Sequence, residues 1–170
     1  MSDISKEKIK EKLKQISLFK TFKEDDAALD KFTAIIDIVN FQKGDYIIKE
    51  GDQGDEMFIL NKGRVSVEKR TLKDDSYTVV ELTESMHVFF GELALMDSDV
   101  RSASVVALSD CECFSIRKDS FEKLGDEDTR LGLYVTREIA KLLSTRLRNA
   151  NRDNITLFEA LVAEIEGSGA

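Results

Sequence analysis

The spacing of apolar residues divides the chain into three regions with different periods. In residues 1–36 apolar positions recur at helical spacing among charged residues, which predicts an amphipathic helix over 4–16 and a second helix over about 24–35. From 37 to 117 the period shortens, and β-prone runs such as "DYIIKE" and "MFILN" alternate with turn residues. Many short strands separated by turns are typical of an antiparallel sandwich or barrel.

A helical period returns at about residue 129, and we assign 118–166 to C-terminal helices. One face of the last helix carries residues at intervals of 4, 3, 4, 3 and 4, namely Leu143, Leu147, Ala150, Asn154, Leu157 and Leu161. This is a heptad seam with a polar Asn at one core position. The seam would either fold back on the chain's own β-region or pair with a second copy in a homodimer. Residues 167–170 are expected to be a disordered tail.

Composition narrows the choice of function. The formal net charge is −8, which argues against nucleic acid as a partner, since such binders need a basic surface. No apolar run approaches the roughly 20 residues that cross a bilayer, and the N-terminus has no apolar signal segment. Two cysteines, one residue apart, form no disulfide framework. We therefore expect a cytoplasmic protein without a membrane partner.

Few residues are suited to metal binding or catalysis. A single histidine, His87, excludes His-rich zinc sites and lacks a nucleophile partner, so we expect a structural role for it. Cys111 and Cys113 would share one face of a strand as small buried hydrophobes. In the turn "EGDQGDEM", Gly51 and Gly54 are both expected to adopt positive φ, which glycine does without a steric penalty. We expect no metal site and no enzyme activity.

The stretch "FGELALMDSDVRSASV" (90–105) holds the strongest candidate for a binding site. "FGELAL" has the composition of a short helix, whose N-terminus offers free N–H groups to an anion, and Gly91 permits close approach. The carboxylate of Glu92 suits a ligand hydroxyl, and the planar fork of Arg101 suits phosphate oxygens. Ser102, Ala103 and Ser104 would keep the adjacent wall open. These features favour a singly charged phosphate joined to a sugar; the alternative is a structural Glu92–Arg101 ion pair.

Together, "FQKGDYIIKEGDQGDEMFILNKGRVSV" (41–67) and "FGELALMDSDVRSASVVA" (90–107) resemble the cyclic nucleotide-binding domain family. The likeness runs from about Leu18 to Asn151. It implies a mainly β fold: an antiparallel, jelly-roll-like β-roll over 37–117, with N-terminal helices and a long C-terminal lid or dimerisation helix. The segment "LTESMHVFFGE" departs from the family pattern, because it lacks the usual Gly-Asp turn and is about two residues longer.

The resemblance also implies roles for individual residues. Glu92 would bind the ribose 2′-hydroxyl, and Arg101 the cyclic phosphate, together with backbone N–H groups around Gly91, Leu93 and Ala103. Ser102 would touch the phosphate or a guanine amino group. The purine would be walled by Val79, Val80 and Leu93, and capped by Arg146 or Asn149 from the lid helix.

The function that follows is a non-catalytic sensor of cAMP or cGMP. Ligand binding in the β-roll would move the C-terminal helix and so signal to an unknown downstream protein. Two alternatives stay open: a ligand-free interaction or dimerisation module that uses the helix seam, and a fragment of a DNA-binding regulator.

Overall fold

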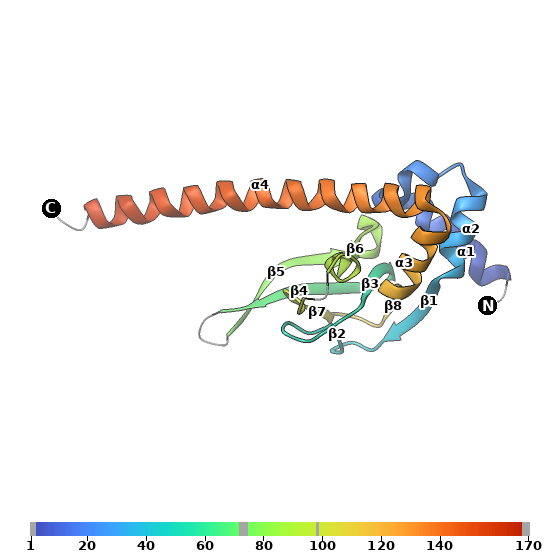
Figure 1. The fold of residues 1–170 in the computed structure, drawn as a ribbon. Coiled ribbons are helices and arrows are strands. Elements are labelled where there is room, and N and C mark those ends of the chain that lie inside the picture. Colours follow the sequence, from blue (N-terminus) through green and yellow to red (C-terminus); the bar gives the residue numbers. More distant parts are fainter. Residues whose placement is uncertain (1–2, 72–74, 98, 168–170) are drawn as a thin grey trace. The chain divides into compact units, whose positions relative to one another are not determined.

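The computed structural model describes residues 3–71, 75–97 and 99–167, and it contains eight β-strands with helices on either side of them in sequence (Figure 1). The strands are β1 (Ile36–Phe41), β2 (Tyr46–Ile48), β3 (Glu56–Lys62), β4 (Arg64–Arg70), β5 (Ser76–Thr83), β6 (Phe89–Phe90), β7 (Ser104–Ala107) and β8 (Cys111–Arg117). The α-helices are α1 (Asp3–Gln15), α2 (Asp26–Ala34), α3 (Lys118–Glu127) and α4 (Thr129–Gly167), and three short 3₁₀ segments are η1 (Ser17–Phe22), η2 (Glu84–Met86) and η3 (Glu92–Leu95). The predicted mainly β fold with flanking helices is confirmed.

The strands form two antiparallel sheets of four strands each. One sheet has the order β1-β8-β3-β6, and the other has the order β2-β7-β4-β5. A cluster of buried side chains joins the two sheets, and its members come from both of them: Ile47, Ile48, Phe58, Leu60, Val65, Phe90, Val105, Ala107, Cys111 and Cys113. The two cysteines share the inner face of β8, as predicted. Burial raises the pKa of the Cys113 thiol to about 12, so this side chain serves as a small apolar group.

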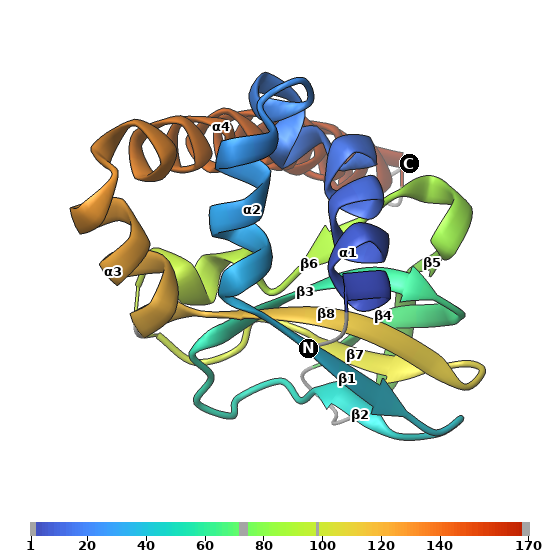
Figure 2. The ribbon, with the colours of Figure 1, turned by 90° about the vertical axis from the view of Figure 1, so that its right-hand side faces the viewer.

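The N-terminal helices α1 and α2 lie over the outer side of the first sheet (Figure 2), and its central strands β8 and β3 are buried over most of their length. Along β3, Phe58 and Leu60 face the other sheet, whereas Met57 and Ile59 face outward, and all four are buried. The helical layer supplies a second apolar core that includes Phe19, Phe22 and Phe32, with ring centroids of Phe19 and Phe32 4.8 Å apart. This layer explains why β3 reads as a continuous apolar run rather than an alternating one.

Several short elements were not predicted from the sequence. The 3₁₀ segment η1 follows α1 directly and buries Leu18, Phe19 and Phe22. The segment that departs from the family pattern forms the end of β5, then η2, and then the two-residue strand β6. His87 ends η2 with a left-handed φ of 50°.

The chain divides into two compact units, residues 1–135 and 136–170. The first holds both sheets, α1 to α3 and the start of α4, where Leu131 and Val135 are buried. The second consists of the rest of α4 and, taken by itself, has no other element among the described residues to cover the apolar seam from Leu143 to Leu161. Of the predicted disordered tail, Gly167 ends α4 and 168–170 lie outside the described residues. Among the described helices, none combines the length and apolar character needed to span a bilayer.

Candidate functional site

Gly91 marks the point where β6 turns into η3. Its φ is 75°, in the left-handed region that glycine adopts readily. A Cβ at this position would lie 2.8 Å from Cδ1 of Ile48 and 2.9 Å from Nη1 of Arg101. Backbone conformation and close packing therefore both require glycine here, and the absence of a side chain lets Arg101 approach the start of η3.

The Arg101 guanidinium is held by two backbone carbonyls. Its Nη2 donates to the carbonyl oxygen of Glu56 at 2.7 Å, and its Nη1 donates to that of Gly91 at 3.3 Å. Burial lowers the pKa of Arg101, and the nearby carboxylates of Glu56 and Asp55 oppose this effect. Because an arginine stays protonated in proteins, the site keeps a partly buried, oriented positive charge.

The turn between β2 and β3 fixes the backbone of Arg101. The Arg101 N–H donates to the carbonyl of Asp52, and the Gly51 N–H donates to the carbonyl of Arg101, both at 2.9 Å. Gly51 has the expected positive φ of 86°. The expectation was wrong for Gly54, whose φ does not lie in the left-handed region. A Cβ on Gly54 would lie 2.1 Å from Nε of Arg101. Glycine is therefore required at position 54 because a side chain would overlap Arg101, and not because of the backbone conformation.

Glu92 is the first residue of η3 and is only 2% exposed. A buried carboxylate is costly unless polar groups surround it. The structure brings Gly91 and Arg101 into contact, although ten residues separate them, and Glu92 follows Gly91 directly. Leu93, the next residue in η3, is half-buried.

The three small residues after Arg101 differ in their surroundings. Ser102 is exposed and Ala103 is half-buried. Ser104 is buried at the start of β7, and its Oγ accepts a hydrogen bond from the Glu50 N–H at 3.0 Å. Its hydroxyl is therefore engaged in joining β7 to the end of β2.

Val79 and Val80 lie on β5, at the edge of the second sheet. Val80 pairs with Val67, and Val67 pairs in turn with the buried Val105 of β7, so these three valines share the inner face. An irregularity in the pairing between Val67 and Glu68 leaves Val79 as an extra residue, and such bulges re-aim a side chain. Both Val79 and Val80 are exposed, at 51% and 42%, and are therefore accessible to a ligand.

Arg146 and Asn149 lie on the part of α4 that forms the second unit. They are three residues apart and therefore share a helix face. Their role at the base of a ligand stays a prediction.

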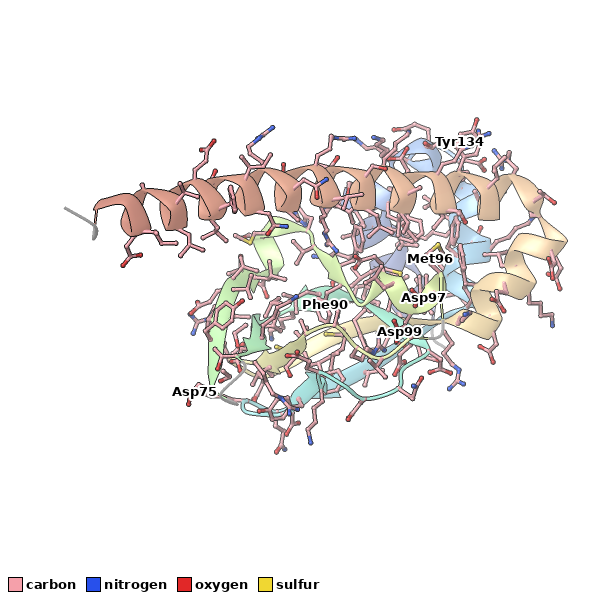
Figure 3. The ribbon with its side chains drawn as sticks, turned by 60° about the vertical axis from the view of Figure 1, so that its left-hand side comes forward. Asp75, Phe90, Met96, Asp97, Asp99 and Tyr134 are labelled. Atoms are coloured by element: carbon pink, nitrogen blue, oxygen red, sulfur yellow. The ribbon has the colours of Figure 1, made fainter. Side chains whose placement is uncertain are left out.

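Sequence reasoning missed the contribution of Gly54 and of the Glu56 carbonyl, which lie 45 or more residues from Arg101 in sequence. A cavity of about 240 Å³ adjoins Gly54 and is lined by Gln53, Asp55, Asp97 and Lys118. Lys118 Nζ donates to the carbonyl of Asp97 at 2.8 Å, which ties α3 to the loop after η3. Figure 3 shows Asp97 in this loop, near Met96 and Asp99. Within the described residues no group of three or more His, Cys, Asp or Glu side chains is arranged to hold a metal ion.

The sequence matches one family model and is similar to several known proteins. Residues 38–128, more than half of the chain, match the family described as "Cyclic nucleotide-binding domain". The chain is 36% identical over 146 residues to cGMP-dependent protein kinase 2 of Homo sapiens, covering 84% of this chain but 17% of the kinase. It is 32% identical over 123 residues to the cAMP-dependent protein kinase regulatory subunit of Dictyostelium discoideum, covering 66% of this chain and 37% of that protein.

A solved structure of the same kind of domain has a similar fold. A cyclic nucleotide-binding domain from Methylobacillus flagellatus superposes with a TM-score of 0.73 at 24% identity, covering 86% of this chain and 80% of that one. At this level of identity the match supports the shared fold alone. The chain spans well under two thirds of the length of the two kinase proteins that it matches.

Proposed function

The chain belongs to the cyclic nucleotide-binding domain family, and from this premise we propose that it is a non-catalytic sensor that binds cAMP or cGMP. The observation that carries the proposal is the partly buried Arg101 guanidinium, oriented by two backbone carbonyls beside Gly91 and Glu92. A cyclic phosphodiester carries one negative charge, which one guanidinium matches. Neutral carbonyls orient the arginine without cancelling its charge.

The chemistry of the remaining contacts follows from the same geometry. The first N–H groups of η3 have no acceptor within the helix and are suited to phosphate oxygens, together with the backbone around Ala103. The Glu92 carboxylate accepts a hydrogen bond from the ribose 2′-hydroxyl. A hydrogen bond to a charged group contributes roughly 1.5–3 kcal/mol of net stabilisation. Leu93, Val79 and Val80 provide an apolar wall for the purine, and Ser102 contacts the phosphate or a guanine amino group.

The proposed contacts fit both cAMP and cGMP. Relatives of both kinds match the chain, a cGMP-dependent kinase and a cAMP-dependent kinase regulatory subunit. Mass spectrometry of the nucleotide released on denaturing the purified protein identifies which of the two the protein carries.

The signal would pass through α4. Arg146 or Asn149 would cap the purine, so that the ligand favours one position of the helix over others. A ligand shifts such an equilibrium only by its difference in affinity for the two states. The apolar seam of α4, with Asn154 at a core position, suits pairing with a second copy or contact with a downstream protein.

Thermal unfolding of nucleotide-free protein tests the proposal. A ligand that binds only the folded state, at a concentration of about 100 times its Kd, raises stability by about 2.7 kcal/mol. We expect a clear rise in Tm with cAMP or cGMP and none with 5′-AMP, whose phosphate is not cyclic. An unchanged Tm with both cyclic nucleotides would favour the alternative of a ligand-free interaction module.

A further inference from the structure

A second polar cavity lies within the first unit, between α1 and the η2 segment. Its volume is about 380 Å³. Three elements contribute its lining: α1, the end of β3, and η2 with the residue after it, through Lys8, Glu11, Lys12, Gln15, Asn61, Glu84, Ser85 and His87. None of these residues takes part in the nucleotide site proposed above.

Lys12 is the unusual residue of this cavity, because its charged side chain is only 7% exposed. Its Nζ donates to the backbone carbonyl of Glu84 at 3.2 Å, the one hydrogen bond that it makes among the described residues. Burial lowers the pKa of Lys12, and the negative charge of Glu84 opposes that effect. An ammonium group has three donors, so a buried lysine with one neutral acceptor has donors left for a ligand.

The other charged groups around the cavity are already engaged. Lys8 Nζ lies 2.7 Å from Oε1 of Glu112 on β8, and Glu11 pairs with Lys14 Nζ at 2.8 Å. Oε2 of Glu84 accepts a hydrogen bond from the Gly63 N–H at 2.6 Å. Within the described residues Lys8 and Lys12 each donate one hydrogen bond from Nζ, but only that of Lys8 goes to a carboxylate, so Lys12 is the lysine of this lining without an ion-pair partner.

The wall opposite α1 offers further donors. Ser85 and His87 are exposed and line the cavity. The Ser85 hydroxyl lies 3.0 Å from Oγ1 of Thr83, which can accept or donate and so leaves Ser85 able to donate to a ligand. His87 adopts a left-handed backbone conformation that is uncommon outside glycine. The His87 N–H donates to the same Glu84 carbonyl that accepts from Lys12, at 3.3 Å. The strained residue and the buried lysine thus meet at one backbone oxygen, and strain of this kind gathers at functional sites.

We propose that this cavity is a second binding site, for a small oxyanion such as the carboxylate or phosphate group of a metabolite, with Lys12 Nζ as its main donor and Ser85 and His87 as supporting donors. The carboxylates of Glu11 and Glu84 also line the cavity and repel anions, so Lys12 supplies the attraction on which binding depends. The site stands independently of the proposed nucleotide function.

Residue-resolved NMR of the ¹⁵N-labelled full chain tests the proposal. The chain is titrated with inorganic phosphate and, separately, with acetate, at constant ionic strength set by sodium chloride. We expect saturable shifts of the Ser85 and His87 amide signals with at least one anion; response to acetate alone indicates a carboxylate ligand, and to phosphate alone a phosphate. Shifts confined to Gly91 and Arg101 would place the anion at the nucleotide site and overturn the proposal.

Two variants and one control complete the test. Lys12→Gln should weaken binding at least tenfold, whereas Lys6→Gln, an exposed position on the same helix and outside the cavity lining, should leave it unchanged. Ser85→Ala alters an exposed side chain and should weaken binding a few-fold, which keeps the test decisive if Lys12→Gln fails to fold. Wild-type affinity in Lys12→Gln, wild-type affinity in Ser85→Ala, or Ser85 and His87 shifts that do not saturate with either anion would each contradict the proposed site.

Discussion

At the scale of single residues, the position of the Arg101 guanidinium depends on two glycines that lie in different connections between strands. Gly91 and Gly54 pack against it from the start of η3 and from the β2–β3 turn, and each leaves no room for a Cβ. The carbonyls of Gly91 and Glu56 then fix the orientation of its N–H donors. The geometry of the arginine is therefore set mainly by backbone atoms.

Replacement of Gly54 should disturb the site more than the fold. In Gly54→Ala the new methyl group would overlap Nε of Arg101, so we expect the affinity for cyclic nucleotide to fall at least tenfold, or about 1.4 kcal/mol. Gly44→Ala is the matched control, because Gly44 has a φ of 96° but no atom within 4 Å of the place that a Cβ would occupy. It should cost about 1–2 kcal/mol of stability and leave the affinity unchanged. Calorimetry and thermal unfolding of both variants check this, and the reverse pattern would contradict it.

The candidate residues between 90 and 105 could be recognised from the sequence, whereas the groups that contact Arg101 from elsewhere in the fold could not. Gly91, Glu92 and Arg101 lie in one short stretch, so residue chemistry alone could join them. Gly54 contacts Arg101 across the fold, and no local pattern indicates that contact. The Glu56 carbonyl was missed for the same reason, since a backbone acceptor carries no residue type by which to recognise it.

At the scale of elements, Asp25 joins the start of α2 to the start of α4. Its Oδ1 accepts a hydrogen bond from the Ala28 N–H at 3.0 Å, and its Oδ2 lies 2.8 Å from Nη2 of Arg130. The Ala28 N–H and then the Arg130 guanidinium hold the pKa of Asp25 below its ordinary value of 3.8. The ionised carboxylate therefore serves as both helix cap and ion-pair partner.

The cap and the charge can be separated by mutation. Asp25→Ala should lower Tm at neutral pH, whereas Asp25→Asn should lower it less, because asparagine also caps helices. A depressed pKa in the folded state gives stability that is present above the unfolded pKa and is lost as the pH falls through the folded value. The wild type should therefore lose its advantage over Asp25→Asn below about pH 4. Asp26→Asn is the control, and an equal loss in that variant would contradict the assignment.

The elements that were predicted are those whose pattern is long or regular. The 39 residues of α4 have a sustained helical period, and β3, β4 and β8 are each seven residues of strand-forming composition. The two-residue strand β6 and the 3₁₀ segments are too short to set a period of their own. They form because neighbouring strands and helices hold them, as when the Leu60 N–H donates to the carbonyl of Val88 at 3.1 Å.

At the scale of the whole molecule, the chain combines a β-roll unit that has two apolar cores with a helical second unit that has none of its own among the residues described. Residues 1–135 bury apolar side chains both between the sheets and beneath the N-terminal helices. Residues 136–165 carry an apolar face that their own unit cannot cover. Such a helix reaches its full stability through contacts with something outside its unit.

Pairing of α4 between two copies is testable by sedimentation. We expect a concentration-dependent dimer, because the seam has heptad spacing and Asn154 at a core position. Leu157→Asp combined with Leu161→Asp should shift the equilibrium to monomer, whereas Arg148→Asp combined with Arg152→Asp, off the seam, should not. A wild-type chain that stays monomeric at high concentration would contradict the dimer and leave the seam for a different partner protein.

The most direct measurement of the central claim is a calorimetric titration of nucleotide-free protein with cAMP and with cGMP, repeated on Arg101→Ala. We expect saturable binding of at least one of them to the wild type. We also expect a loss of about 2–5 kcal/mol in Arg101→Ala, because that change leaves a buried phosphate charge without its partner. Absence of binding by either nucleotide, or equal affinities in wild type and variant, would contradict the role of Arg101 and the function proposed from it.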